Sequence, residues 1–77
     1  MNQEPYQRVI TIVVEILRVD PADIGPETHF IDDLGASSMD LIEMLSMAEY
    51  TFGRTIPDDR IAEFSTIAKV VDFFDAA

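Results

Sequence analysis

The feature that most constrains the fold is a regular apolar pattern in the middle of the chain. Between Ser38 and Gly53 no glycine or proline occurs, and apolar side chains recur every three or four residues. This spacing places them on one face of an α-helix. The face consists of Leu41, Ile42, Leu45, Ala48 and Phe52. We therefore predict a helix over residues 38–52 with this face directed inward. Gly53 suits its end because glycine adopts the left-handed conformation without strain.

The opposite face of this predicted helix is polar and should contact solvent. Its polar residues are Asp40, Glu43, Ser46, Glu49 and Tyr50. Three methionines, Met39, Met44 and Met47, are interspersed along the same segment. Unbranched thioethers fit irregular cores and also adaptable binding surfaces, so their type alone leaves both roles open.

Two adjacent serines stand where this helix should begin. Ser37, with Asp40 three residues later, matches a variant of the capping box, which makes Ser37 the cap and Ser38 the first helical residue. Ser38 should then project from a helix end where backbone N–H groups lack partners and the dipole is positive. Such an end is a natural seat for a phosphate group.

Residues 6–19 carry an unbroken and mostly β-branched apolar pattern that a buried strand or a helix could explain. The segment is longer than a usual strand. Pro5 suits a helix start, and Arg18 suits a last helical turn. We therefore predict a helix here.

Residues 20–37 should form a long connection, because prolines and glycines punctuate them. The apolar residues expected to pin this loop to the core are Ile24, Phe30, Ile31 and Leu34.

Two further helices are expected after Gly53. Pro57 can open a short third helix with acidic residues in its first turn and with Ile61 and Phe64 directed inward. Ser65 is the expected cap of a last helix, whose apolar residues are Ile67, Val70, Val71 and Phe74. The predicted fold is a small all-α four-helix bundle, with three longer helices and one short third helix, formed by residues 1–77 as a single domain.

The strong negative charge limits the kinds of partner. The 77 residues include 15 Asp and Glu against 5 Lys and Arg, a net charge of −10. Nucleic acids and anionic membranes are disfavoured because both attract basic side chains, whereas partners with basic patches are favoured. The chain has no cysteine, which excludes disulfides and thiolate metal sites. Without a leader pattern or an apolar run of membrane-spanning length, we expect a cytoplasmic protein with no membrane insertion.

Two other kinds of site are disfavoured by the residues themselves. His29, Ser38 and Asp40 could in principle form a nucleophile, base and orienting group, but nothing in the sequence brings them within hydrogen-bonding reach. Residues 32–43 have the length of an EF-hand loop, but Leu34 and Ala36 stand where oxygen ligands are needed. We expect neither a catalytic nor a metal site.

The segment Phe30-Ile31-Asp32-Asp33-Leu34-Gly35-Ala36-Ser37-Ser38-Met39-Asp40 resembles the attachment motif of acyl carrier proteins. Phe52-Gly53 and Ile56-Pro57-Asp58-Asp59 also resemble that family at its usual spacing from the serine. The resemblance implies that Ser38 carries a covalent 4′-phosphopantetheine arm derived from coenzyme A. The chain departs from the family at Ser37, where an aspartate is common.

The resemblance also implies the partners and the biochemical role. A phosphopantetheinyl transferase would modify the protein, and acyl-processing enzymes with basic docking patches would bind it as a monomer. The implied partner contacts are Met39, Asp40, Ile42, Glu43, Met47 and Glu49. The protein would not be an enzyme but an acyl carrier for fatty-acid or polyketide-type enzymes. An aminoacyl, D-alanyl or peptidyl carrier remains an alternative, as does an unmodified helical interaction module.

Overall fold

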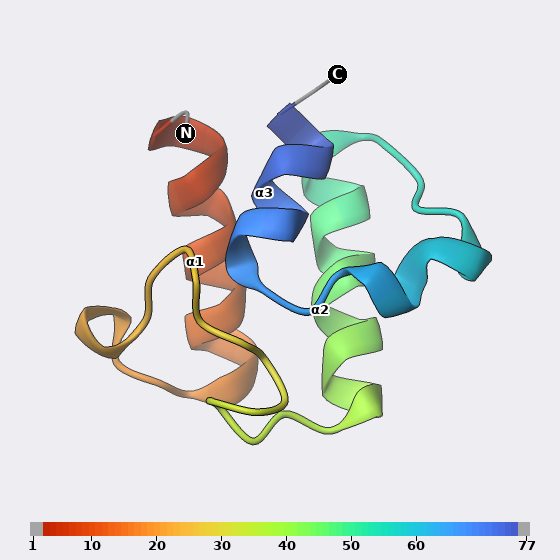
Figure 1. Ribbon diagram of the computed structural model, residues 1–77. Helices are drawn as coiled ribbons and strands as arrows, with labels where there is room; N and C mark the ends of the chain where they lie inside the picture. The colour runs from red at the N-terminus through yellow and green to blue at the C-terminus, as the bar shows by residue number, and fades with distance from the viewer. Residues whose placement is uncertain (1–2, 76–77) are drawn as a thin grey trace.

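The computed structural model describes residues 3–75, which form three α-helices and two short 3-10 helices (Figure 1). The α-helices are α1 (Gln3–Leu17), α2 (Ser38–Phe52) and α3 (Ile67–Asp75), and the 3-10 helices are η1 (Pro21–Asp23) and η2 (Asp58–Glu63). No strand occurs within residues 3–75, where a single isolated β-bridge joins His29 and Thr66. The predicted all-helical class is therefore confirmed.

The three α-helices enclose one apolar core. α1 runs antiparallel to α2, and α3 packs against α1 (Figure 1). Each helix directs its apolar stripe inward, which removes that surface from water. The largest fully buried side chains are Val13 of α1, Phe30 of the first loop, and Ile67 and Val71 of α3. The loop residue Phe30 is thus as much a part of the core as the helices are.

The first helix is displaced towards the N-terminus relative to the predicted span of residues 6–19. It already includes Gln3, and Pro5 lies in its first turn, where a missing N–H is tolerated. Its last helical residue is Leu17, because Arg18 has a positive φ of 56° and donates its backbone N–H to the carbonyl of Val14 at 2.9 Å. Arg18 therefore closes the helix from outside instead of lying in its last turn.

The long connection between α1 and α2 is only partly pinned in the predicted way. Phe30 is buried, and Ile24 and Leu34 are half-buried against the core. Ile31 is 50% exposed, so its prediction as a core residue is wrong. Because Phe30 takes the inward position, the tight turn that follows carries the adjacent side chain to the surface. That turn is closed by the N–H of Gly35 donating to the carbonyl of Ile31 at 3.1 Å.

The last two predicted helices also differ in detail. The short third helix is the 3-10 helix η2, and Phe64, although buried, follows its end. The cap of α3 is Thr66, whose Oγ1 accepts the N–H of Lys69 at 3.3 Å. Ser65, the predicted cap, instead uses its backbone carbonyl to accept the N–H of Phe30 at 3.0 Å. Long-range pairing of the first loop therefore moves the cap by one residue.

The helices are short relative to the thickness of a bilayer. None of the helices within residues 3–75 is long and apolar enough to cross a membrane.

Candidate functional site

The loop that leads to α2 is held by the start of α3. The N–H of Ile67 donates to the carbonyl of Thr28 at 3.3 Å, and the N–H of Ala68 donates to Pro26 at 2.9 Å. Together with the bond from Phe30 to Ser65, these bonds join two segments that lie far apart in the sequence. They satisfy the first backbone N–H groups of α3, which have no partner inside that helix.

A compact turn then carries the chain from His29 to α2. The carbonyl of His29 accepts the N–H groups of Asp33 and Leu34 at 3.1 and 3.2 Å, and the carboxylate of Asp33 accepts the N–H of His29 at 2.8 Å. Gly35 has a φ of 68°, a conformation that favours glycine. Ala36 is buried and donates its N–H to Phe30 at 3.0 Å. The direction in which the chain enters α2 is therefore fixed by hydrogen bonds on both sides of the turn.

Ser37 caps α2 as predicted. Its Oγ accepts the N–H of Asp40 at 3.0 Å, and the carboxylate of Asp40 accepts the N–H of Ser37 at 3.0 Å. This reciprocal pair is a complete capping box. Asp40 is half-buried and its carboxylate is bound at the helix start, although it was expected to face solvent.

Ser38 is the first residue of α2 and is exposed. None of the hydrogen bonds within residues 3–75 uses its hydroxyl group, and none uses the backbone N–H of Ser38 or Met39. Two free N–H groups and an unengaged hydroxyl thus lie together at the positive end of a helix dipole. A phosphate ester on Ser38 would find hydrogen-bond donors and favourable charge at this position.

Apolar side chains are exposed beside Ser38 and along α2. Met39 is 74% exposed and Ile42 47% exposed, while Met44 lies in the core. The prediction that Ile42 faces inward is therefore wrong. Leu41, Met44 and Leu45 occupy the buried stripe, which leaves Ile42 at its edge. The exposed large apolar residues are Ile31, Met39, Ile42, Met47 and Tyr50.

Glu49 closes the other end of α2 and does not face solvent freely. Its side chain is half-buried and accepts the N–H of Ile56, a buried residue in the loop after the helix. Its backbone carbonyl accepts the N–H groups of Gly53 and Arg54 at 2.8 and 3.2 Å. The predicted solvent-facing position of Glu49 is wrong, because a tertiary hydrogen bond that no local pattern reveals draws its carboxylate inward.

A small pocket lies between α2 and η2. Its volume is about 130 Å³. Its lining combines the aliphatic residues Ile42, Leu45, Ile56 and Ile61 with the polar residues Ser46, Glu49 and Asp58. The sequence marked Ile61 as an inward residue of the short third helix, but it could not show that α2 and η2 leave space between them.

The titratable side chains of the described residues are dispersed with respect to metal binding. Residues 3–75 contain no group of three or more His, Asp or Glu side chains that could hold a metal ion. The carboxylate of Asp40 receives the N–H of Ser37 and takes no part in a hydrogen bond to Ser38 or His29. The described contacts therefore link no base to the Ser38 hydroxyl.

Comparison with known protein families agrees with this geometry. A profile of the family described as the phosphopantetheine attachment site matches residues 7–74, which extend from α1 to α3 and include Ser38. The match covers most of the chain, and the resemblance to acyl carrier proteins inferred from residues 30–40 is confirmed at the level of this family. Members of the family carry a covalent 4′-phosphopantetheine group. The chain belongs to the phosphopantetheine attachment site family and is a phosphopantetheine carrier protein.

Proposed function

We propose that Ser38 is the attachment residue and that the protein is an acyl carrier, not itself an enzyme. The observation that supports this most directly is the exposed and unengaged hydroxyl of Ser38 at the first position of α2. The neighbouring Ser37 hydroxyl is occupied in the capping box. When bound, the 4′-phosphopantetheine arm supplies a terminal thiol that holds acyl groups as thioesters.

The residues around Ser38 support attachment by a separate enzyme. No described base contacts the hydroxyl, so an external transferase must activate it. Once the ester is formed, the free N–H groups of Ser38 and Met39 can bind the phosphate oxygens. The capping box holds these groups in place, because the Ser37 and Asp40 bonds fix the first turn of α2.

The aliphatic side chains of the pocket between α2 and η2 support an acyl cargo. Its aliphatic lining removes an alkyl chain from water, which favours fatty-acyl or polyketide-type intermediates. Glu49 and Asp58 also line the pocket, and the Glu49 carboxylate already accepts the N–H of Ile56, so Asp58 is the group that would attract the ammonium of an aminoacyl cargo. Transfer of the acyl group would depend on partner enzymes.

The surface proposed for those enzymes is the exposed side of α2. Met39, Ile42 and Met47 offer apolar area, and Glu43 adds an exposed negative charge. Asp40 and Glu49 belong to the same proposed surface, although each is half-buried and bound to backbone N–H groups. A basic partner patch would complement this face. Phosphopantetheinyl transferase and acyl-processing enzymes are the expected occupants.

The attachment proposal is tested by incubating the purified protein with coenzyme A and a phosphopantetheinyl transferase of broad specificity. The mass of the intact wild-type chain should rise by one phosphopantetheine group, whereas that of Ser38→Ala should not change. Thermal melts of both proteins should coincide, because the Ser38 side chain makes no described contact. If the wild-type protein gains no mass with several transferases, the interaction-module alternative is favoured.

The cargo is tested by loading the arm from hexanoyl-coenzyme A and from glycyl-coenzyme A. The hexanoyl form should melt several degrees higher than the glycyl form, since about 1 kcal/mol shifts a domain of this size by roughly 4–8 °C. Ile42→Ser at the pocket should remove most of the difference. Equal melting temperatures of the two loaded forms would reject a stored alkyl chain.

The partner surface is tested by charge reversal. Glu43→Lys should weaken binding to a cognate acyl-processing enzyme and leave the unfolding free energy nearly unchanged, because Glu43 is exposed. Glu27→Lys, in the first loop, changes the net charge equally and is the matched control. Equal weakening by both variants would show a general charge effect instead of docking on α2.

A further inference from the structure

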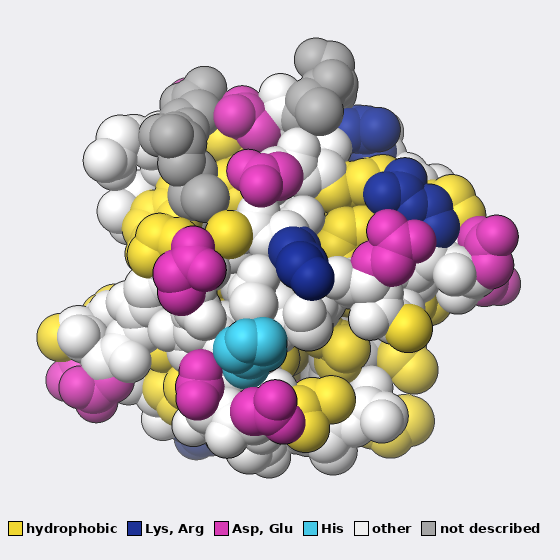
Figure 2. Space-filling model, in the orientation of Figure 1, with side chains coloured by type: hydrophobic (Ala, Val, Ile, Leu, Met, Phe, Trp, Pro, Cys, Tyr) yellow, Lys and Arg dark blue, Asp and Glu magenta, His cyan; other side chains and the backbone are white. Residues whose placement is uncertain are grey.

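Positive side chains are few in this acidic protein, and three of them gather at one place. Arg54, Arg60 and Lys69 line the same open pocket, which has a volume of about 610 Å³ and whose lining also includes Glu63 and Asp72. They come from the loop after α2, from η2 and from α3, respectively. The whole chain has only five Lys and Arg residues. Figure 2 shows dark blue side chains on the upper right and centre of the visible face, with magenta acidic side chains beside them.

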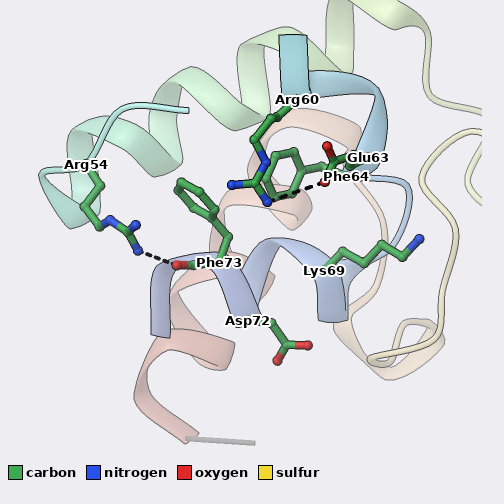
Figure 3. Close-up of a pocket in the computed structure, with 7 residues that line it drawn as sticks. All are labelled: Arg54, Arg60, Glu63, Phe64, Lys69, Asp72 and Phe73. Carbon is green, nitrogen blue, oxygen red and sulfur yellow. Dashed lines mark hydrogen bonds and ion pairs between the residues drawn. The ribbon is translucent and has the colours of Figure 1, made fainter. Parts of the chain in front are cut away.

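Aromatic rings form the floor of this pocket. The guanidinium carbon of Arg54 lies 4.3 Å from the centre of the Phe73 ring, and that of Arg60 lies 5.4 Å from it. Figure 3 shows the Phe73 ring between the two guanidinium groups. Phe64 meets Phe73 edge-on, with ring centres 5.3 Å apart. Stacking on Phe73 restrains both arginines, which reduces the entropy lost when they bind a partner.

Most donors of these three cations are not used within the described structure. Arg54 donates one N–H to the carbonyl of Phe73, in the last turn of α3. Arg60 shares one contact of 3.4 Å with Glu63, and both side chains are largely exposed, so this pair is weak. Lys69 forms no ion pair with any residue in 3–75. The three cations outnumber the two carboxylates of the lining, Glu63 and Asp72, so the pocket is locally positive on an acidic protein and offers guanidinium and ammonium donors to an anionic ligand.

We propose that this pocket is a docking site for an acidic segment of a partner protein that also carries an apolar side chain. Carboxylates of the segment would pair with Arg54 and Arg60 in the two-bond geometry that guanidinium groups favour. An apolar side chain between them would cover Phe64 and Phe73. Arginine and aromatic residues together are typical of energetically important interface positions.

The construction of the pocket favours such a segment over a single phosphate group. Phosphate sites commonly use backbone N–H groups at a helix start or in a glycine-rich loop. Here the donors are side chains from three separate elements, arranged around an open aromatic floor. That arrangement matches spaced carboxylates on a peptide chain.

The pocket lies near the end of α2 opposite Ser38, since Arg54 follows Gly53 and Ser38 begins the helix. Figure 1 shows the loop after α2 and the start of α2 at opposite ends of the helix. A partner held at the pocket would leave Ser38 free. The proposal goes beyond the carrier role and does not depend on it, because neither the pocket nor its test involves modification of Ser38.

The test uses the full unmodified chain and a short dye-labelled peptide of alternating glutamate and phenylalanine. Fluorescence anisotropy should show saturable binding that weakens as salt rises. The double variant R60E/K69E should bind about tenfold or more weakly, because two attractive charges become repulsive. Both residues are exposed, and circular dichroism should show an unchanged helical fold. The control is Arg18→Glu, an exposed cation outside the pocket, which is compared with the single variant Arg60→Glu of equal charge change and should change the affinity less than about twofold.

Further measurements distinguish an acidic-segment site from a phosphate site and from binding elsewhere on the protein. Amide NMR shifts on peptide addition should cluster at Arg54, Arg60, Lys69 and Phe73. A peptide with glutamine in place of glutamate should not bind. The proposal would be overturned by the absence of saturable binding, by shifts confined to α2, or by equal weakening in the control variant. Displacement of the peptide by inorganic phosphate, but not by chloride at equal ionic strength, would identify a phosphate site and also overturn it.

Discussion

The two ends of α2 differ in how their backbone groups are used. The first residue of the helix is an exposed serine with free backbone N–H groups beside it. Near the last turn, one residue accepts three N–H groups from the chain that follows. The first end involves Ser38, and the second involves Glu49, which accepts from Gly53, Arg54 and Ile56. Both ends belong to one helix of regular geometry. They differ because the only side-chain cap at the start, Ser37, accepts the N–H of Asp40, whereas at the other end Glu49 accepts through both its backbone carbonyl and its carboxylate.

The difference separates a site for chemistry from a site for stability. Free N–H groups at the start of α2 favour an added phosphate, so that end has binding capacity that the fold itself does not use. At the other end the hydrogen bonds of Glu49 and the stacking of Arg54 on Phe73 attach the following loop to α2 and α3. Changes to Ser38 should therefore affect modification and leave stability unchanged, whereas changes to the residues that hold either end in place should affect stability.

The largest effect on stability should follow from truncating Phe30, the buried residue that anchors the loop before Ser38. Phe30→Ala deletes a side chain that is only 1% exposed, and it should lower the free energy of unfolding by about 3–5 kcal/mol. Urea unfolding followed by circular dichroism measures this loss. Ile31→Ala, at the exposed neighbouring residue, is the control and should change stability by less than about 0.5 kcal/mol. Similar losses in the two variants would contradict the assignment of Phe30 as the anchor of the loop.

The next largest effect on stability should come from Glu49, near the last turn of α2. Glu49→Ala leaves the N–H of the buried residue Ile56 without its acceptor and should cost about 1–3 kcal/mol. Chemical denaturation is again the measurement. Glu43→Ala removes a carboxylate of the same helix that is exposed, and it should be close to neutral. A Glu49 variant as stable as the Glu43 variant would show that the bond to Ile56 contributes nothing.

Gly53 provides a purely conformational test at the same end. Its φ is 69°, and a Cβ added there would meet no atom within 4 Å, so the cost of Gly53→Ala comes from the backbone alone. We expect a loss of about 1–2 kcal/mol. Gly25→Ala is the matched control, because its added Cβ also meets nothing and its φ is not positive. That variant should be neutral or slightly stabilising. The same loss in both alanine variants would argue against a left-handed closure of α2.

The smallest expected change in stability concerns Ser37, at the start of α2. Ser37→Ala removes the cap of α2 and should cost about 1 kcal/mol, while modification by the transferase should continue. Ser46→Ala, in the exposed middle of α2, should stabilise by roughly 0.5 kcal/mol or less because alanine is the better helix former. The two substitutions are chemically identical and should have opposite signs. A thermal melt of each variant distinguishes them.

Local patterns predicted the helices and the capping box well. The apolar spacing of residues 38–52 identified α2, and the serine–aspartate spacing identified the reciprocal bonds of Ser37 and Asp40. Such features depend on residues within one or two turns of each other. For the same reason the left-handed closure at Gly53 was predictable.

The errors arise where distant segments meet. Thr66 replaces Ser65 as the cap of α3 because the first loop pairs with the Ser65 backbone. Glu49 turns inward because Ile56, seven residues later, offers it an N–H. The exposure of Ile31 and Ile42 was not predicted, because apolar character alone does not show whether another segment packs over a side chain. The pocket lined by Arg54, Arg60 and Lys69 could not be predicted either, since its residues come from three separate elements.

The proposed division between the two ends of α2, with the arm on Ser38, is tested most directly by locating the group on the modified wild-type chain. Tandem mass spectrometry of the peptide containing residues 30–40, after treatment with transferase and coenzyme A, distinguishes the two adjacent serines. We predict fragment ions that place the whole added mass on Ser38 and none on Ser37. Fragments that place it on Ser37 would contradict this division, because that hydroxyl is the one assigned to the cap.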